Sequence, residues 1–334
     1  MTRVAVTGAT GYIGQELANV LASWPRIETV LRIDRVFDQS HPDMLQVDLS
    51  NGSVEDVSSA LEGVDTVFHL AAARTDWGLS STEYFRDNVE ATRTIIEAVQ
   101  RAGVRRLVHF STVGVYGPSA TAKRETENFE PVTDYGITKA KAEEELTEAA
   151  AKYGWSLRVL RPSAVFSEYQ PSNTNIYRLI EAIRKHKFVM VGDGSEIKTT
   201  SYLRNVVDAA LWLYQDLQSG GIRVFNYVDE PKLSTKDLVS LISAELGRLW
   251  RPPRIPLPVV LGPARILDRV AEVTRRDLPI TSARIRKFCT PTDFDSSLIR
   301  SSGFKPHYDS LTALRRTVAW HRGAEPDTQP DLGI

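Results

Sequence analysis

The sequence predicts an α/β fold, a doubly wound parallel sheet with a smaller lobe interleaved into the second half of the chain. Three short apolar runs recur in the first third, at Val4–Val6, Thr29–Ile33 and Thr66–Leu70. Helical apolar spacing fills segments between and after these runs, as at 14–22 and 89–102. Strands that alternate with helices form βαβ units, whose parallel sheet is covered by helices on both faces.

The predicted sheet continues with two more apolar runs, Arg106–Phe110 and Leu157–Leu160. Beyond about residue 161, proline and glycine interrupt the pattern more often. Helical stretches at 175–186 and 235–246 stand there among short strands. The second half of the chain therefore predicts insertions that form the smaller lobe.

The domain boundaries follow from this change of pattern. We expect the main domain over residues 1–165, with later strands returning to it from about 200–230. The smaller lobe is expected mainly over 166–322, and 323–334 is expected to be a disordered tail.

Composition narrows the class of protein. The 334 residues carry a formal charge of −1, and this balance argues against a nucleic-acid-binding face. The single cysteine, Cys289, allows no internal disulfide framework and fits a reducing compartment. No signal peptide pattern precedes the first strand, and no apolar run approaches the roughly 18 residues of a membrane span. The histidines show no metal-ligand spacing, so we expect no metal. Together these features predict a cytoplasmic protein with no spanning segment.

A glycine loop, TGATGYIG, joins the first strand to the first helix. Gly8 lets the chain turn sharply, Gly11 lets the backbone approach a pyrophosphate, and Gly14 lets the helix pack closely on the strand. The helix begins at about Tyr12 and Ile13, where unpaired N–H groups point at the phosphates. This block predicts a Rossmann-type dinucleotide-binding site.

An acidic residue, Asp34, ends the next strand, about 20 residues after the last glycine of the loop. Its carboxylate can accept hydrogen bonds from the adenosine ribose hydroxyls and repels a 2′-phosphate. The sequence therefore favours NAD over NADP as the cofactor. Arg35, the next residue, weakens this preference without reversing it.

Other cofactor contacts are expected because they follow the ends of other predicted strands. Asp48 and Leu49 stand where such folds commonly contact the adenine. Small residues follow the strand at 66–70 and let the backbone lie close to the cofactor. The expected contacts there are Leu70, Ala71 and Ala72.

Tyr135 and Lys139 are four residues apart and therefore lie on one face of a predicted helix. A tyrosine hydroxyl is normally too weakly acidic to ionise near neutral pH. A nearby ammonium, together with the positive nicotinamide ring, favours the phenolate and lets Tyr135 act as a general base. The strand end at 110–112 carries hydroxyls, of which Thr112 is expected to hydrogen-bond the reacting oxygen.

The segments TGATGYIG, HLAAA, FSTVGVYG, YGITK and LRPSAVF, in this order and spacing, resemble the extended short-chain dehydrogenase/reductase superfamily, in its NAD-dependent epimerase/dehydratase branch. The resemblance runs from about residue 3 to about residue 320. It implies an NAD-binding Rossmann domain, a substrate-binding lobe, and a homodimer formed through helices of the cofactor domain.

The same resemblance implies roles for single residues. Tyr135 takes the role of general base, and Lys139 both contacts the nicotinamide ribose and tunes Tyr135. Thr112 stands where the family has its Ser or Thr, and Asn88 matches an asparagine that organises the site from the neighbouring helix. The remaining cofactor contacts expected are Ser111 and Pro162.

Two departures from the family pattern bear on the activity. Sugar-nucleotide 4,6-dehydratases carry an Asp-Glu pair directly after the catalytic Thr, whereas this chain has Val113 and Gly114, which move no proton. We therefore do not expect a dehydratase. Lys198 stands where many sugar-nucleotide enzymes place an Arg on the substrate diphosphate, and it supplies charge without the bidentate fork. The other expected substrate contacts are Arg74, Trp77, Thr112, Asn175 and Arg284.

These observations lead to the hypothesis of an NAD-dependent epimerase that acts on a nucleotide-activated sugar through a transient keto intermediate. The alternatives are a net sugar-nucleotide dehydrogenase or ketoreductase, and a 3β-hydroxysteroid-dehydrogenase-like enzyme on an apolar alcohol. The fourth hypothesis is a non-catalytic NAD-binding regulator, and the presence of Tyr135 and Lys139 argues against it. We interpret the apolar stretch at 255–270 as a cover of the substrate cleft, in preference to a helix that lies on a membrane surface.

Overall fold

The computed structural model describes residues 2–324, except 75–77, 249–251, 261, 263–268 and 270–288. The chain divides into two compact units. The first comprises residues 1–163, 203–228 and 294–306, and the second comprises the described parts of 164–202, 229–293 and 307–334. Residues 325–334 of the expected tail and half of the 255–270 stretch lie outside the described residues.

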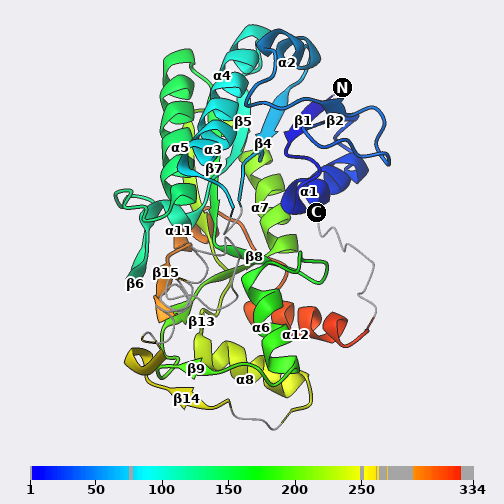
Figure 1. Cartoon of the computed structure of the whole chain (residues 1–334). Helices are drawn as coiled ribbons and strands as arrows, with labels where there is room; N and C mark the ends of the chain where they lie inside the picture. The colour runs from blue at the N-terminus through cyan, green and yellow to red at the C-terminus, as the bar shows by residue number, and fades with distance from the viewer. Residues whose placement is uncertain are drawn as a thin grey trace. The chain divides into compact units, whose positions relative to one another are not determined.

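A parallel sheet, seven strands among the described residues, forms the centre of the first unit (Figure 1). The strands are β1 (Arg3–Thr7), β2 (Thr29–Asp34), β3 (Leu45–Gln46), β4 (Thr66–His69), β5 (Arg106–Phe110), β7 (Ser156–Pro162) and β12 (Ile222–Tyr227). Their order across the sheet is β3-β2-β1-β4-β5-β7-β12, and each neighbouring pair is parallel. The predicted α/β fold is confirmed. The strand order reverses between β1 and β4, the switch point beside which open α/β sheets bind their ligands.

Helices cover both faces of this sheet (Figure 1). One face carries α2 (Val54–Ala60), α4 (Ala91–Ala102) and α5 (Asp134–Tyr153), and the other carries α1 (Tyr12–Ser23) and α7 (Leu203–Asp216). Successive strand residues point to opposite faces. Val67 of β4 accordingly joins the apolar cluster under α4 and α5, whereas the ring of Phe68 lies 5.9 Å from that of Tyr214 on α7. Both faces are buried, which explains why the strands are apolar without alternation.

Short elements complete the first unit. They are α3 (Ser81–Phe85), the π-helical turn η1 (Arg86–Glu90), the 3-10 turns η2 (Val113–Tyr116) and η3 (Leu217–Ser219), β6 (Ser119–Lys123) and α11 (Ser297–Ser301). The segment 294–306, which the sequence analysis places in the smaller lobe, belongs to this unit. The reason is that α11 packs beside β12, where Arg300 Nη2 donates to the carbonyl oxygen of Val228 at 2.6 Å.

The second unit has its own apolar core, which includes Ile180, Tyr202, Ile242 and Leu314. Its helices are α6 (Asn175–Arg184), α8 (Thr235–Glu245) and α12 (Ser310–His321). Its strand pairs are β8 (Ala164–Phe166) with β11 (Thr200–Tyr202), β9 (Met190–Val191) with β14 (Arg254–Ile255), and β10 (Ile197–Lys198) with β13 (Leu233–Ser234) and β15 (Thr292–Phe294). Within the described ranges, no helix is both long and apolar enough to cross a membrane.

Candidate active site

The loop between β1 and α1 has the geometry of a phosphate-binding turn. Gly8 has a φ of +70°, and a Cβ there would lie 2.8 Å from the backbone nitrogen of Ala71. A Cβ at Gly14 would lie 2.0 Å from the carbonyl oxygen of Gly8. Only glycine fits at these two positions, so α1 packs directly on the loop. Since α1 begins at Tyr12, its unpaired N–H groups stand at the end of the loop, as binding of a dinucleotide requires.

Asp34 lies beside this loop at the end of β2. Its Oδ2 accepts a hydrogen bond from the backbone nitrogen of Thr10 at 3.0 Å, and its Oδ1 accepts one from that of Val36 at 3.2 Å. These bonds fix the carboxylate against the glycine loop and leave lone pairs for further donors. The half-buried carboxylate therefore fits the ribose hydroxyls of NAD.

The segments that follow β3 and β4 carry further predicted cofactor contacts. Asp48 Oδ1 accepts from the backbone nitrogen and the hydroxyl of Ser50. The backbone nitrogens of Leu70 and Ala71 both donate to Thr7 Oγ1 at 3.1 Å. The loop after β4 is thereby held against the end of β1, and Ala72 is exposed there. The side chain of Leu49, by contrast, belongs to the apolar core, because it is buried against the sheet.

Tyr135 and Thr112 lie on two elements that pack against each other, helix α5 and the turn η2. Tyr135 lies in the first turn of α5, which Thr133 caps, and Thr112 follows β5 and caps η2. The Thr112 hydroxyl lies close enough to the phenol of Tyr135 to lower its pKa. Burial raises the pKa of Tyr135 above its usual value, and the charge of Arg74 and the Thr112 hydrogen bond act against this rise.

Lys139 lies one turn after Tyr135 and is buried. Its Nζ donates to the carbonyl oxygen of Phe110 at 2.6 Å and lies 3.5 Å from His109 Nε2. Burial lowers the pKa of Lys139 to about 8, and Glu143, one turn further along α5, opposes that fall. From the sequence, this ammonium is expected to lower the pKa of Tyr135. In the structure the ammonium is bound to the end of β5, and Arg74 supplies the positive charge near the phenol.

Two histidines that the sequence leaves without a role form a layer beneath Lys139. The rings of His69 and His109 stack with centroids 5.3 Å apart. His69 is fixed by the hydroxyls of Thr7 at 2.8 Å and Thr92 at 3.0 Å. Burial lowers the pKa of His69 to about 3 and that of His109 well below its usual value, so both rings are neutral at physiological pH. A neutral His109 can accept a hydrogen bond from the Lys139 ammonium.

Asn88 connects the loop after β4 to helix α5. Its Oδ1 accepts from the backbone nitrogen of Ala73 at 2.6 Å, and its Nδ2 donates to Thr138 Oγ1 at 2.9 Å. Asn88 lies on η1, and π-helical turns are frequent at functional sites. Thr138, which the sequence analysis missed, lies between Tyr135 and Lys139 on α5, and only the fold reveals its contact with Asn88.

The other predicted residues are distributed as follows. Ser111 is buried at the end of β5, and Pro162 ends β7. Arg74 is exposed just after β4. Asn175 begins α6, and Lys198 lies on β10, where its Nζ donates to the carbonyl oxygen of Thr290; both belong to the second unit. Trp77 and Arg284 lie outside the described residues. In the parts that the structure describes, no group of His, Cys, Asp and Glu could hold a metal ion.

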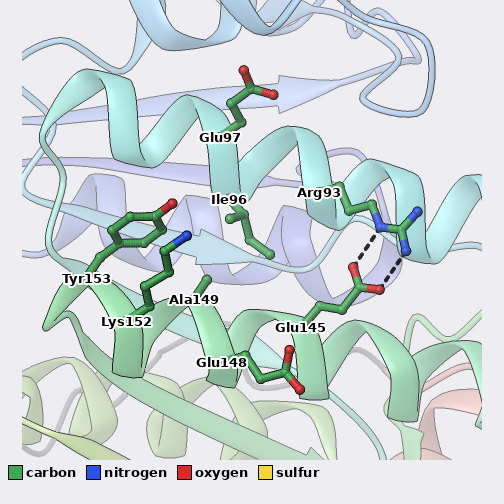
Figure 2. A pocket seen from close by; sticks show the side chains of 8 residues that line it. All are labelled: Arg93, Ile96, Glu97, Glu145, Glu148, Ala149, Lys152 and Tyr153. Atoms are coloured by element: carbon green, nitrogen blue, oxygen red, sulfur yellow. Dashed lines mark hydrogen bonds and ion pairs between the residues drawn. The ribbon is translucent and has the colours of Figure 1, made fainter.

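An open hollow of about 390 Å³ lies on the outer face of α4 and α5 (Figure 2). None of the residues that line it belongs to the candidate active site. Its lining is mostly charged, and Arg93 forms an ion pair with Glu145 at 2.7 Å across it. Glu145 lies ten residues after Tyr135, roughly 15 Å along the helix. The hollow is lined by Arg93, Ile96, Glu97, Glu145, Glu148, Ala149, Lys152 and Tyr153.

Comparison with known proteins identifies the family. Residues 4–227 match the NAD dependent epimerase/dehydratase family. The chain belongs to this family. Its members are NAD-dependent enzymes of the extended short-chain dehydrogenase/reductase type, which agrees with the resemblance noted in the sequence and with the glycine loop and Asp34.

Individual relatives cover nearly the whole chain. N-acetyl-alpha-D-glucosaminyl-diphospho-ditrans,octacis-undecaprenol 4-epimerase from Escherichia coli O157:H7 is 30% identical over 322 residues, 95% of this chain and 94% of the relative. A dTDP-glucose 4,6-dehydratase from Streptomyces griseus is 27% identical and covers 96% of this chain and 94% of its own. The solved structure of MoeE5 in complex with UDP-glucuronic acid and NAD is 28% identical, with a TM-score of 0.74, and covers 96% and 99% of the two chains.

The pKa of Lys139 generates a testable pH dependence. We expect the affinity of the nucleotide-free protein for NAD⁺ to be full below about pH 8 and to fall above it, because Lys139 then loses its proton and its charge. Titration calorimetry between pH 6 and pH 10 measures this. Lys139→Met should bind weakly and without the inflection, whereas Lys141→Met, an exposed lysine of the same helix, should behave as the wild type. A wild-type affinity that stays constant across this range contradicts the prediction.

Proposed function

We propose that the protein is an NAD-dependent epimerase that acts on a sugar carried on a diphosphate, through a transient keto intermediate. The observation that carries the proposal is the cluster of Thr112, Tyr135 and Lys139 at the carboxyl end of β5. Reversible oxidation of an alcohol needs a hydroxyl that hydrogen-bonds the substrate oxygen and a phenol that exchanges the proton.

In the proposed mechanism Thr112 donates a hydrogen bond to the substrate hydroxyl oxygen and aligns it with Tyr135. Tyr135 then takes the hydroxyl proton as the carbon is oxidised. Bound NAD⁺ supplies the chemistry of accepting the hydride from that carbon and of returning it. Tyr135 keeps the proton in a half-buried position and gives it back to the same oxygen when the ketone is reduced on its other face. Arg74 and Thr112 favour the phenolate that the first step requires.

The residues after Thr112 support epimerisation over 4,6-dehydration. Elimination of water requires an additional acid and base beside the substrate. Val113 is buried and apolar, and Gly114 has no side chain, so η2 supplies neither group. Dehydratases stand among the relatives of the chain, and this difference in side chains is the reason that we propose a different reaction for this protein.

A diphosphate is common to the ligands named for two of the relatives that cover nearly the whole chain. The Escherichia coli relative is named as an epimerase of a sugar on undecaprenyl diphosphate, and the MoeE5 structure contains UDP-glucuronic acid. We therefore propose a diphosphate-linked sugar, with a nucleotide or a polyprenol as the carrier. Lys198 and Asn175 of the second unit, with Arg74, Trp77 and Arg284, are proposed as substrate contacts, and the protein is proposed to be a homodimer.

Replacing Tyr135 by Phe tests its role as the base. We expect Tyr135→Phe to lower kcat by about 10² to 10⁴-fold, because the proton acceptor is lost. NAD⁺ affinity, measured by calorimetry, should stay within about threefold of the wild type, since the ring remains. Tyr153→Phe, at the other end of the same helix, is the matched control and should keep full activity. A Tyr135→Phe enzyme with an unchanged rate rejects the mechanism.

The activity itself is tested by following the hydride and the sugar together. Purified protein is incubated with UDP-, GDP- and dTDP-sugars and with polyprenyl-diphosphate sugars, with and without NAD⁺. A new epimer without stoichiometric NADH is the expected result. Accumulation of NADH would instead establish a net dehydrogenase, and a 4-keto-6-deoxy product would establish a dehydratase. Reaction of apolar alcohols alone would reject the sugar substrate.

A further inference from the structure

Arg35 follows Asp34 directly and would suit a cofactor with a 2′-phosphate. Arginines near the end of the second strand of Rossmann folds accommodate the 2′-phosphate of NADP. The side chain of Arg35 is 49% exposed. The family is NAD-dependent, and a structural feature in addition to Asp34 engages this guanidinium.

That feature is the carboxylate of Asp87 on η1. Arg35 Nη1 donates to Asp87 Oδ2 at 2.9 Å, and Arg86 donates to Asp87 Oδ1 at 2.7 Å. Both oxygens of the carboxylate are therefore engaged by arginines. The Asp87 side chain is only 5% exposed, so this is a buried anion with two cations at the surface, unlike an ordinary exposed ion pair.

The π-helical turn explains how Asp87 reaches Arg35. Asp87 and Asn88 are consecutive, and both are buried. Asn88 is bound to the loop after β4 through Ala73, while Asp87 is bound to the residue that follows β2. The turn thus connects the corner that Asp34 occupies with the corner that carries Tyr135.

We propose that Asp87 is a specificity-determining residue, which disfavours NADP by holding Arg35 in an ion pair instead of leaving it for a 2′-phosphate. The proposal concerns the cofactor site alone and does not depend on which sugar the enzyme uses.

The charges around the site agree with this role. The carboxylates of Asp34 and Asp87 balance the charges of the Arg35 and Arg86 guanidiniums. These four groups together therefore have no net positive charge that would attract a phosphate dianion. Asp48, two residues after β3, is a further anion that acts on Arg86. In this arrangement Asp34 repels the 2′-phosphate and Asp87 occupies the cations that would attract it.

The direct test is Asp87→Asn, which removes the charge and keeps the size of the side chain. Binding of NAD⁺ and NADP⁺ to nucleotide-free protein is measured by titration calorimetry, which requires no substrate. We expect the Kd for NADP⁺ to fall by about tenfold or more, because Arg35 becomes available for a charge-assisted hydrogen bond. The Kd for NAD⁺ should stay within about threefold. Normal NAD⁺ binding with no gain for NADP⁺ overturns the proposal.

Paired variants assign the gain to Arg35. The double variant Arg35→Ala/Asp87→Asn should lose the gain, whereas Arg86→Ala/Asp87→Asn should retain it. A gain that survives the removal of Arg35 overturns the proposal. The single variant Arg35→Ala provides a test that holds even where Asp87→Asn does not fold. It should leave the Kd for NADP⁺ unchanged, and a several-fold weaker binding would show that Arg35 is already free and would overturn the proposal.

Discussion

The hydrogen bond from the Lys139 ammonium to the Phe110 carbonyl oxygen, 2.6 Å long, joins helix α5 to the carboxyl end of β5. A buried charge is costly unless it is hydrogen-bonded, so Lys139 holds the helix in one register against the strand. Tyr135 precedes Lys139 by one helical turn, and Thr112 follows Phe110 by two residues. The register that this bond sets therefore places the phenol of Tyr135 near the turn that carries Thr112.

A polar layer beneath the helices extends the same constraint across the sheet. Thr7 at the end of β1 binds His69, and its hydroxyl also accepts from the loop after β4. His69 stacks on His109, which lies against Lys139. Asn88 adds a link from that loop to Thr138 on α5. The cofactor corner and the catalytic corner are thus parts of one hydrogen-bonded layer, in which a displacement of one loop is transmitted to the others.

The features that sequence reasoning could predict are those with a local signature. The strands are apolar runs, the glycine loop needs small residues at fixed positions, and Tyr135 and Lys139 repeat at helical spacing. Three features have no such signature. The cation beside Tyr135 and the pairing of Arg35 with Asp87 each join segments that are distant in sequence. The π-helical turn depends on an extra residue in a turn. The return of 294–306 to the first unit was missed for the same reason, since the packing of α11 against β12 leaves no periodic pattern.

The central claim is that the hydrogen on the reacting carbon leaves and returns as a hydride within one active site. A substrate that carries deuterium at the epimerised carbon tests it directly, with the product analysed by mass spectrometry and NMR. The account predicts that the deuterium remains on that carbon in the epimer and that turnover is slowed by the label. Replacement of the deuterium by solvent hydrogen would contradict the account, because it would mean that the carbon loses a proton and that Tyr135 serves a different reaction.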